Sequence, residues 1–196
     1  MKRTTSWAKW AGVAVLALAM LGMSSPRAVA SANSGATASV QQSSPKYEAW
    51  LNKQVHHELA MVSWYGVFDE LGYSVNGTEV TLTGNVVKPI TKTEAVARVK
   101  KIEGVTKVND QISLLPPSGM DNRIRRAEYR SIFSYAGLYR YAMGANPSIH
   151  IIVNNGHVTL VGQVDNKSDA QMAYMRASAV PGVFSVTNNL QVNRVS

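Results

Sequence analysis

Residues 76–86 read NGTEVTLTGNV, and residues 154–164 read NNGHVTLVGQV. In each stretch an Asn-Gly pair precedes an alternation of apolar and polar side chains. Asn and Gly both tolerate the positive φ of a tight two-residue turn, and alternation is typical of a strand with one buried face. Each stretch therefore predicts a β-hairpin. The buried positions of its second strand are Val80, Leu82 and Val86 in the first stretch, and Val158, Leu160 and Val164 in the other.

The similarity between these stretches extends well beyond the hairpin. Residues 76–114 align with residues 154–192 at a constant offset of 78 and without a gap. Gly84 aligns with Gly162 and Val108 with Val186. Because so many residue types recur in one fixed register, the sequence predicts two homologous domains.

Each half also predicts two helices and a closing strand. In the first half, apolar residues at helical spacing precede the hairpin, at Leu51, Val55, Leu59 and Val62. A second helix follows it, with capping boxes predicted at residues 91–94 and 168–171. The expected order is αββαβ in two tandem domains of the α+β class, each a three-stranded sheet covered on one face by two helices.

Four glycines recur at equivalent positions of the two halves. Gly84 and Gly162 fall in strands, and Gly104 and Gly182 fall where the second helices are expected to end. A functional role is one interpretation. We favour backbone geometry, because glycine adopts conformations that other residues avoid.

Taken together, these motifs resemble the BON domain, the bacterial osmotic-stress and nodulation module. They stand here as NGTEVTLTGNV…IEGVTKVNDQISL and NNGHVTLVGQV…VPGVFSVTNNLQV, and the resemblance covers both halves of the chain. It implies a non-catalytic α+β domain of periplasmic and outer-membrane proteins, associated with phospholipid membranes and with envelope integrity under osmotic stress. Similar folds also build oligomeric rings in secretion systems.

The N-terminal residues predict export. Lys2, Arg3 and Lys9 precede an apolar run over 11–23, and an A-x-A site ends at Ala30. These features are typical of a secretory signal peptide, although a membrane anchor is the alternative. Cleavage before Ser31 would give a periplasmic or secreted protein. The predicted divisions are a signal peptide at 1–30, a flexible linker at 31–44, domains at 45–116 and 121–196, and a linker at 117–120.

Charge and composition narrow the function classes. The chain carries +8, which falls to +4 without residues 1–30, a mild basic bias that does not indicate nucleic-acid binding. The chain has no cysteine and four histidines, and its spacings do not indicate a zinc site. The sequence also has no G-x-S-x-G motif, no phosphate-binding loop and no cysteine nucleophile, so we expect no enzyme, no catalytic residues, no metal and no cofactor.

Two groups of residues are candidates for membrane binding. Arg123, Arg126 and Arg130 fall on one stripe of a helix, with Phe133 near its edge. The other group is Trp64, Tyr65 and Phe68, whose side chains suit a membrane interface. Alternatively, the arginines form a solvated polar face, Phe133 points inward, and the three aromatic residues belong to a core.

Two hypotheses of different classes follow. In the first, the protein binds anionic phospholipid or another envelope component and supports envelope integrity or osmotic-stress tolerance. In the second, it is a structural module that binds an envelope protein or associates with itself, because sheets with open edges favour association.

Overall fold

Both halves of the chain adopt the element order expected from the repeat. The structure is a computed structural model, and it describes residues 45–144 and 146–193. The signal peptide and the flexible linker predicted for residues 1–44 lie outside the described residues. All described residues belong to one unit of the chain.

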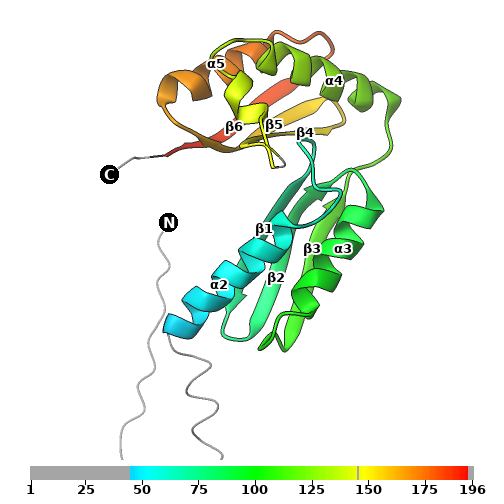
Figure 1. The fold of residues 1–196 in the computed structure, drawn as a ribbon. Helices are drawn as coiled ribbons and strands as arrows, with labels where there is room; N and C mark the ends of the chain where they lie inside the picture. The colour runs from blue at the N-terminus through cyan, green and yellow to red at the C-terminus, as the bar shows by residue number, and fades with distance from the viewer. Residues whose placement is uncertain (1–44, 145, 194–196) are drawn as a thin grey trace, which may run out of the picture. The chain divides into compact units, whose positions relative to one another are not determined.

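The described part of the first half contains two helices and three strands, which are labelled in Figure 1. Its elements, in chain order, are α2 Pro45–Ala60, β1 Glu70–Asn76, β2 Glu79–Val86, α3 Pro89–Lys100 and β3 Lys107–Leu114. Helix α2 buries Leu51, Val55 and Leu59, as the helical spacing predicts.

The second half repeats this order with one short addition, a 3-10 turn after its first helix (Figure 1). Its elements are α4 Gly119–Phe133, η1 Tyr139–Ala142, β4 Ile149–Asn154, β5 His157–Val164, α5 Lys167–Ser178 and β6 Ser185–Val192. Helix α4 begins at Gly119, inside the linker predicted for residues 117–120.

The two sheets have the same topology. Strand β2 lies at the centre of its sheet, antiparallel to β1 and parallel to β3. In the same way, β5 lies at the centre of the other sheet, antiparallel to β4 and parallel to β6. In the second half the predicted Asn155-Gly156 turn joins the antiparallel strands, and both residues have positive φ. In the first half the two-residue turn is Gly77-Thr78, one residue later than the Asn-Gly pair predicts, because Asn76 is the last residue of β1 and pairs with Glu79. The predicted hairpins are therefore confirmed.

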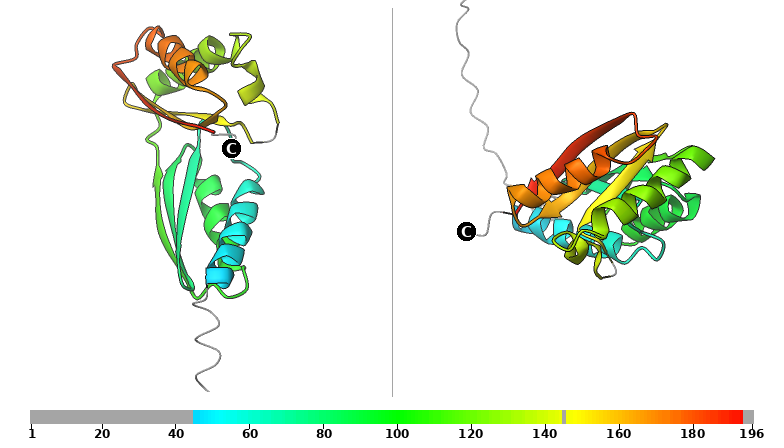
Figure 2. Two further views of the ribbon diagram at one scale, coloured as in Figure 1. Left: turned by 90° about the vertical axis from the view of Figure 1, so that its left-hand side faces the viewer. Right: turned by 90° about the horizontal axis from the view of Figure 1, so that it is seen from above.

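Within each half both helices lie on one face of the sheet (Figure 2). The apolar core lies between these layers, and each half has its own buried cluster. Leu82 and Leu160 are fully buried at the centres of the two cores. The neighbouring residues Thr81 and Thr159 are only half-buried, as the period of two along a strand requires.

Gly84 and Gly162 occupy the same strained position in the two central strands. Their φ angles are 119° and 120°, a region that L side chains rarely adopt. A Cβ at Gly84 would lie 2.1 Å from the carbonyl oxygen of Glu70, and one at Gly162 would lie 2.0 Å from that of Ser148. Backbone geometry therefore accounts for both glycines.

The predicted capping boxes are wrong. Helix α3 starts two residues earlier, at Pro89, so Thr91 lies within its first turn, buried, and donates to the carbonyl of Trp64. Helix α5 is capped by Asn166, whose side chain accepts from the backbone of Asp169. The proline at the first position and the asparagine cap were each a stronger start signal than the Ser/Thr-x-x-Glu/Gln pattern.

Candidate functional site

Helix α4 is held at its start by two hydrogen-bonded residues. Ser118 caps the helix, its hydroxyl accepting from the backbone N–H of Asp121. The buried carboxylate of Asp121 accepts from the backbone N–H groups of Asn155 and Gly156, both at 2.9 Å. The first turn of α4 is thereby fixed to the β4–β5 turn.

The two sides of α4 differ sharply. Ile124, Ile132 and Phe133 are buried in the core of the second half. Arg123 and Arg126 are exposed on the opposite side, as is Arg130 one turn further on. Within the described chain, no carboxylate forms an ion pair with these three arginines. Their positive charges are consequently not neutralised by neighbouring side chains.

A hollow of about 530 Å³ lies along this exposed side of α4, and we call it the basic hollow. Its lining residues are Met120, Arg123, Ile124, Arg126, Ala127, Arg130, Pro181 and Gly182. It offers three guanidinium groups beside an apolar floor, which is an arrangement suited to an anionic group attached to an apolar body.

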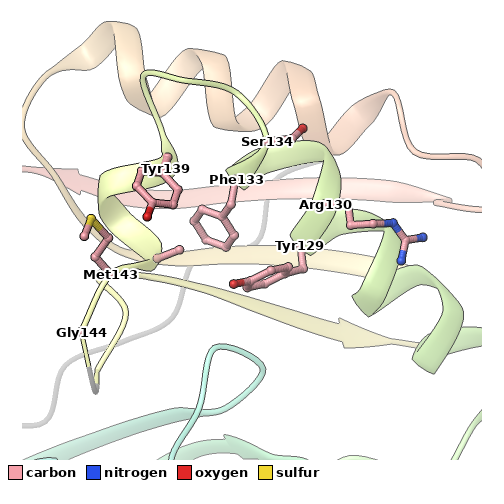
Figure 3. A pocket seen from close by; sticks show the side chains of 8 residues that line it. Tyr129, Arg130, Phe133, Ser134, Tyr139, Met143 and Gly144 are labelled. Carbon is pink, nitrogen blue, oxygen red and sulfur yellow. The ribbon is translucent and has the colours of Figure 1, made fainter.

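A second hollow, of about 630 Å³, lies next to it, and we call it the aromatic hollow. Figure 3 shows the side chains that line it. Its lining residues are Tyr129, Arg130, Phe133, Ser134, Tyr139, Ala142, Met143 and Gly144. Arg130 lines both hollows. Tyr139 and Met143 are 57% and 58% exposed. The two hollows therefore place basic and apolar groups side by side along one surface.

Phe133 itself is not an exposed aromatic residue. It is only 6% exposed and packs edge-on against Tyr129, with ring centroids 5.1 Å apart. The inward interpretation is therefore confirmed. Sequence reasoning missed Tyr139 and Met143, which are the exposed apolar residues beside the arginines. The sequence feature that could have indicated them is the presence of large apolar residues in a segment that has neither helical nor strand periodicity.

Arg125 does not belong to the basic surface. It is buried, and its guanidinium donates to the carbonyl of Val153 at 2.6 Å and to the side chain of Asn122 at 2.7 Å. Burial lowers the pKa of this guanidinium below its usual value. Arg125 thus joins α4 to β4, and its charge is withdrawn from the surface.

Glu128, one turn further along α4, is fully buried. Neither of its carboxylate oxygens has a hydrogen-bond partner among the described residues. Burial raises the pKa of Glu128 to about 8. The side chain is therefore largely neutral at pH 7.

The other aromatic candidates lie in the segment between α2 and β1, and they do not form one surface. Trp64 is 54% exposed, with the ammonium of Lys88 4.5 Å from its ring. Tyr65 is half-buried and stacks on His150 at 5.0 Å, and burial raises its pKa to about 12. Phe68 packs against the core that contains Phe133. Of the three, Trp64 alone is well exposed.

The described residues contain no cluster of three or more His, Cys, Asp or Glu side chains that would hold a metal ion. Over the same residues, no helix has the length and apolar character needed to span a bilayer.

One family model matches both halves of the chain. The family model described as "BON domain" matches residues 48–116 and 140–194, together more than half of the chain. The second match begins after the end of α4.

Known proteins also resemble the chain. Osmotically-inducible protein Y of Escherichia coli (strain K12) is 34% identical over 123 residues. The alignment covers 57% of this chain and 56% of that protein, so the chain spans little more than half of the relative's length.

Two solved structures are of CdsD, a structural protein of the type III secretion system of Chlamydia trachomatis, one of them of its C-terminal domain. They cover 71% and 70% of this chain and 93% and 96% of their own, at 13% and 12% identity. Their TM-scores are 0.28 and 0.24, too low to bear on the fold or the function.

Proposed function

Because this chain belongs to the BON domain family, we propose that it is a non-catalytic protein of the cell envelope that binds anionic phospholipid through the exposed side of α4. The name of its relative, osmotically-inducible protein Y, favours a role in tolerance of osmotic stress. The charged start and A-x-A site of residues 1–30 support export to the envelope.

One observation carries the proposal of a membrane surface. Arg123, Arg126 and Arg130 are exposed along one side of α4, without an ion-pairing carboxylate in the described structure, while the other side is packed into the core. A helix anchored by its apolar side offers its cations at a fixed spacing. Such a surface attracts the phosphate groups of an anionic bilayer.

The adjoining residues add an apolar component. Tyr139 and Met143 border the aromatic hollow that shares Arg130 with the basic hollow. Tyrosine has an apolar ring and a polar tip, so it suits the headgroup region of a bilayer. A surface that combines cations with Tyr and Met binds a bilayer by both charge and apolar burial.

The test removes the charge of the basic hollow without touching the core. In the triple variant Arg123→Gln, Arg126→Gln, Arg130→Gln, affinity for phosphatidylglycerol-containing vesicles should fall about a hundredfold, since each basic group near an anionic surface contributes about 1 kcal/mol. At 0.5 M salt, where the Debye length is about 4 Å, wild-type binding should weaken in the same way.

A second triple variant controls for net charge. Lys53, Lys100 and Lys101 are exposed in the first half, so their replacement by Gln removes the same charge from another surface. This variant should retain most of the vesicle affinity. If the two triple variants bind alike while both melt as the wild type does, α4 is not the binding surface and the proposal fails.

A further inference from the structure

The two sheets expose very different edges. Strand β3 is the last strand of its sheet and β6 the last strand of the other, so in the described chain each has one edge without a neighbouring strand. Their sequences are KVNDQISL and SVTNNLQV. An edge strand offers free backbone donors and acceptors to another strand unless something protects it.

Charges protect β3. Lys107 forms an ion pair with Glu79, and Asp110 forms one with Lys92, both at 3.2 Å. Charged side chains along an edge discourage pairing with a second strand, because pairing would desolvate them. At the equivalent positions, offset by 78, β6 has the neutral residues Ser185 and Asn188. The protection seen in the first half is thus missing from the second.

The side chains of β6 divide by face. Asn188 points to the helical side, where its amide donates to the carbonyl of Ala170 in α5 and its oxygen accepts from the backbone N–H of Leu190. Thr187 and Asn189 alternate with it and are exposed on the opposite face of the sheet. All eight residues of β6 are uncharged.

We propose that the open edge of β6 pairs with β6 of a second copy of this chain, antiparallel and about a two-fold axis, so that two three-stranded sheets become one continuous sheet. The choice of a second copy rests on charge. When two identical strands pair about a two-fold axis, a charged residue near the axis lies close to the same residue of the other copy, and the like charges repel. A strand without charges avoids that repulsion, whereas β3 does not.

The strength of this association is limited by its size. Pairing along eight residues buries less than the roughly 1,200–2,000 Å² of a stable interface. The dimer is therefore weak and forms only as the protein concentration rises.

Matched substitutions in the two strands test the pairing. Asn189→Lys places a charge on β6, and Gln111→Lys places the same charge at the equivalent position of β3. In analytical ultracentrifugation the wild-type protein and Gln111→Lys should dimerise with rising concentration. For Asn189→Lys the dissociation constant should rise about tenfold or more, because each dimer then carries two like charges at the paired edge.

A second measurement needs no variant. Hydrogen exchange of the wild type should show β6 amides gaining protection as concentration rises, while β3 amides do not change. A protein that stays monomeric at every concentration overturns the proposal, and so does a dimer that Asn189→Lys leaves intact or that Gln111→Lys disrupts equally. Vesicle binding of Asn189→Lys should match the wild type, which separates this inference from the proposed function.

Discussion

The backbone N–H of Gly156 donates to the carboxylate of Asp121 across 2.9 Å, although the two residues lie 35 positions apart in the chain. The same carboxylate accepts from Asn155, so one side chain of α4 satisfies two donors of the β4–β5 turn. Both turn residues have positive φ. Asp121 therefore fixes the helix with the basic side to the sheet beneath it.

Replacing Asp121 by Ala should lower the free energy of unfolding of the second half by about 2–4 kcal/mol, since each hydrogen bond to a charged group contributes about 1.5–3 kcal/mol and both N–H donors would be left unpaired. Urea titrations followed by circular dichroism measure the change. Arg123→Ala, an exposed residue in the same turn, is the control and should change stability by less than about 0.5 kcal/mol. Comparable losses would show that Asp121 does not anchor the helix.

Gly162→Ala should destabilise the second half severely, by more than about 3 kcal/mol, because a methyl group would overlap the carbonyl of Ser148 in a conformation that alanine rarely adopts. Gly84→Ala should do the same to the first half, against Glu70. Gly119→Ala is the control, since nothing lies within 4 Å of its Cβ position. If Gly119→Ala lowers the melting temperature as much as Gly84→Ala and Gly162→Ala do, this explanation of the repeated glycine is wrong.

Glu128 predicts a pH dependence with a definite sign. Its pKa is raised from 4.5 to about 8 in the folded protein, so between these values the folded state keeps a proton that the unfolded state releases. Stability should therefore fall as pH rises through this window, by at most about 1.4 kcal/mol per pH unit. Above pH 8 this contribution levels off.

The variant Glu128→Gln isolates that contribution, because glutamine has nearly the same shape and does not titrate. At pH 5 the variant and the wild type should be similarly stable, and at pH 8 the variant should be the more stable one. The difference between the two urea curves cancels titrations at other sites such as His150. A difference that does not depend on pH would mean that Glu128 is solvated in the folded state.

The fold was largely predictable from the sequence because its signals are local. The alternation around Leu82 and Leu160 determines which face of each central strand is buried. The Asn-Gly pair gives the turn of the second hairpin and lies within one residue of the turn of the first. The repeat supplied the domain count, since a second copy in register requires a second fold. Helix starts were less predictable, as Thr91 shows, because a nearby proline competes with the capping pattern.

The candidate site was predictable only in part. Helical spacing correctly grouped Arg123, Arg126 and Arg130 on one exposed side. It did not indicate that Arg125 and Glu128 are buried, because that depends on the carbonyl of Val153 and on the packing of α4 against the sheet. Tyr139 and Met143 were missed for the same reason: their exposure beside Arg130 arises from the path of the chain after α4, which has no periodic pattern.

Tyr139 and Met143 predict that membrane affinity has a component that salt does not screen. The double variant Tyr139→Ala, Met143→Ala removes apolar side chains at the rim of the aromatic hollow without changing the charge. Burial of apolar surface contributes about 25 cal/mol per Å², so loss of two half-exposed side chains should weaken vesicle binding by about tenfold. The slope of affinity against salt concentration should stay as in the wild type, because the arginines are intact.

The arginine triple variant should show the opposite pattern. Its affinity should depend less steeply on salt concentration than that of the wild type, and at high salt the two affinities should be equal. Comparing the four salt titrations of wild type, double, triple and combined variants on phosphatidylglycerol vesicles separates the two contributions. Trp64→Ala serves as a matched aromatic control, since Trp64 is as exposed as Tyr139 but belongs to the first half. If the double variant flattens the salt slope, or if Trp64→Ala weakens binding equally, Tyr139 and Met143 do not form the apolar part of the binding surface.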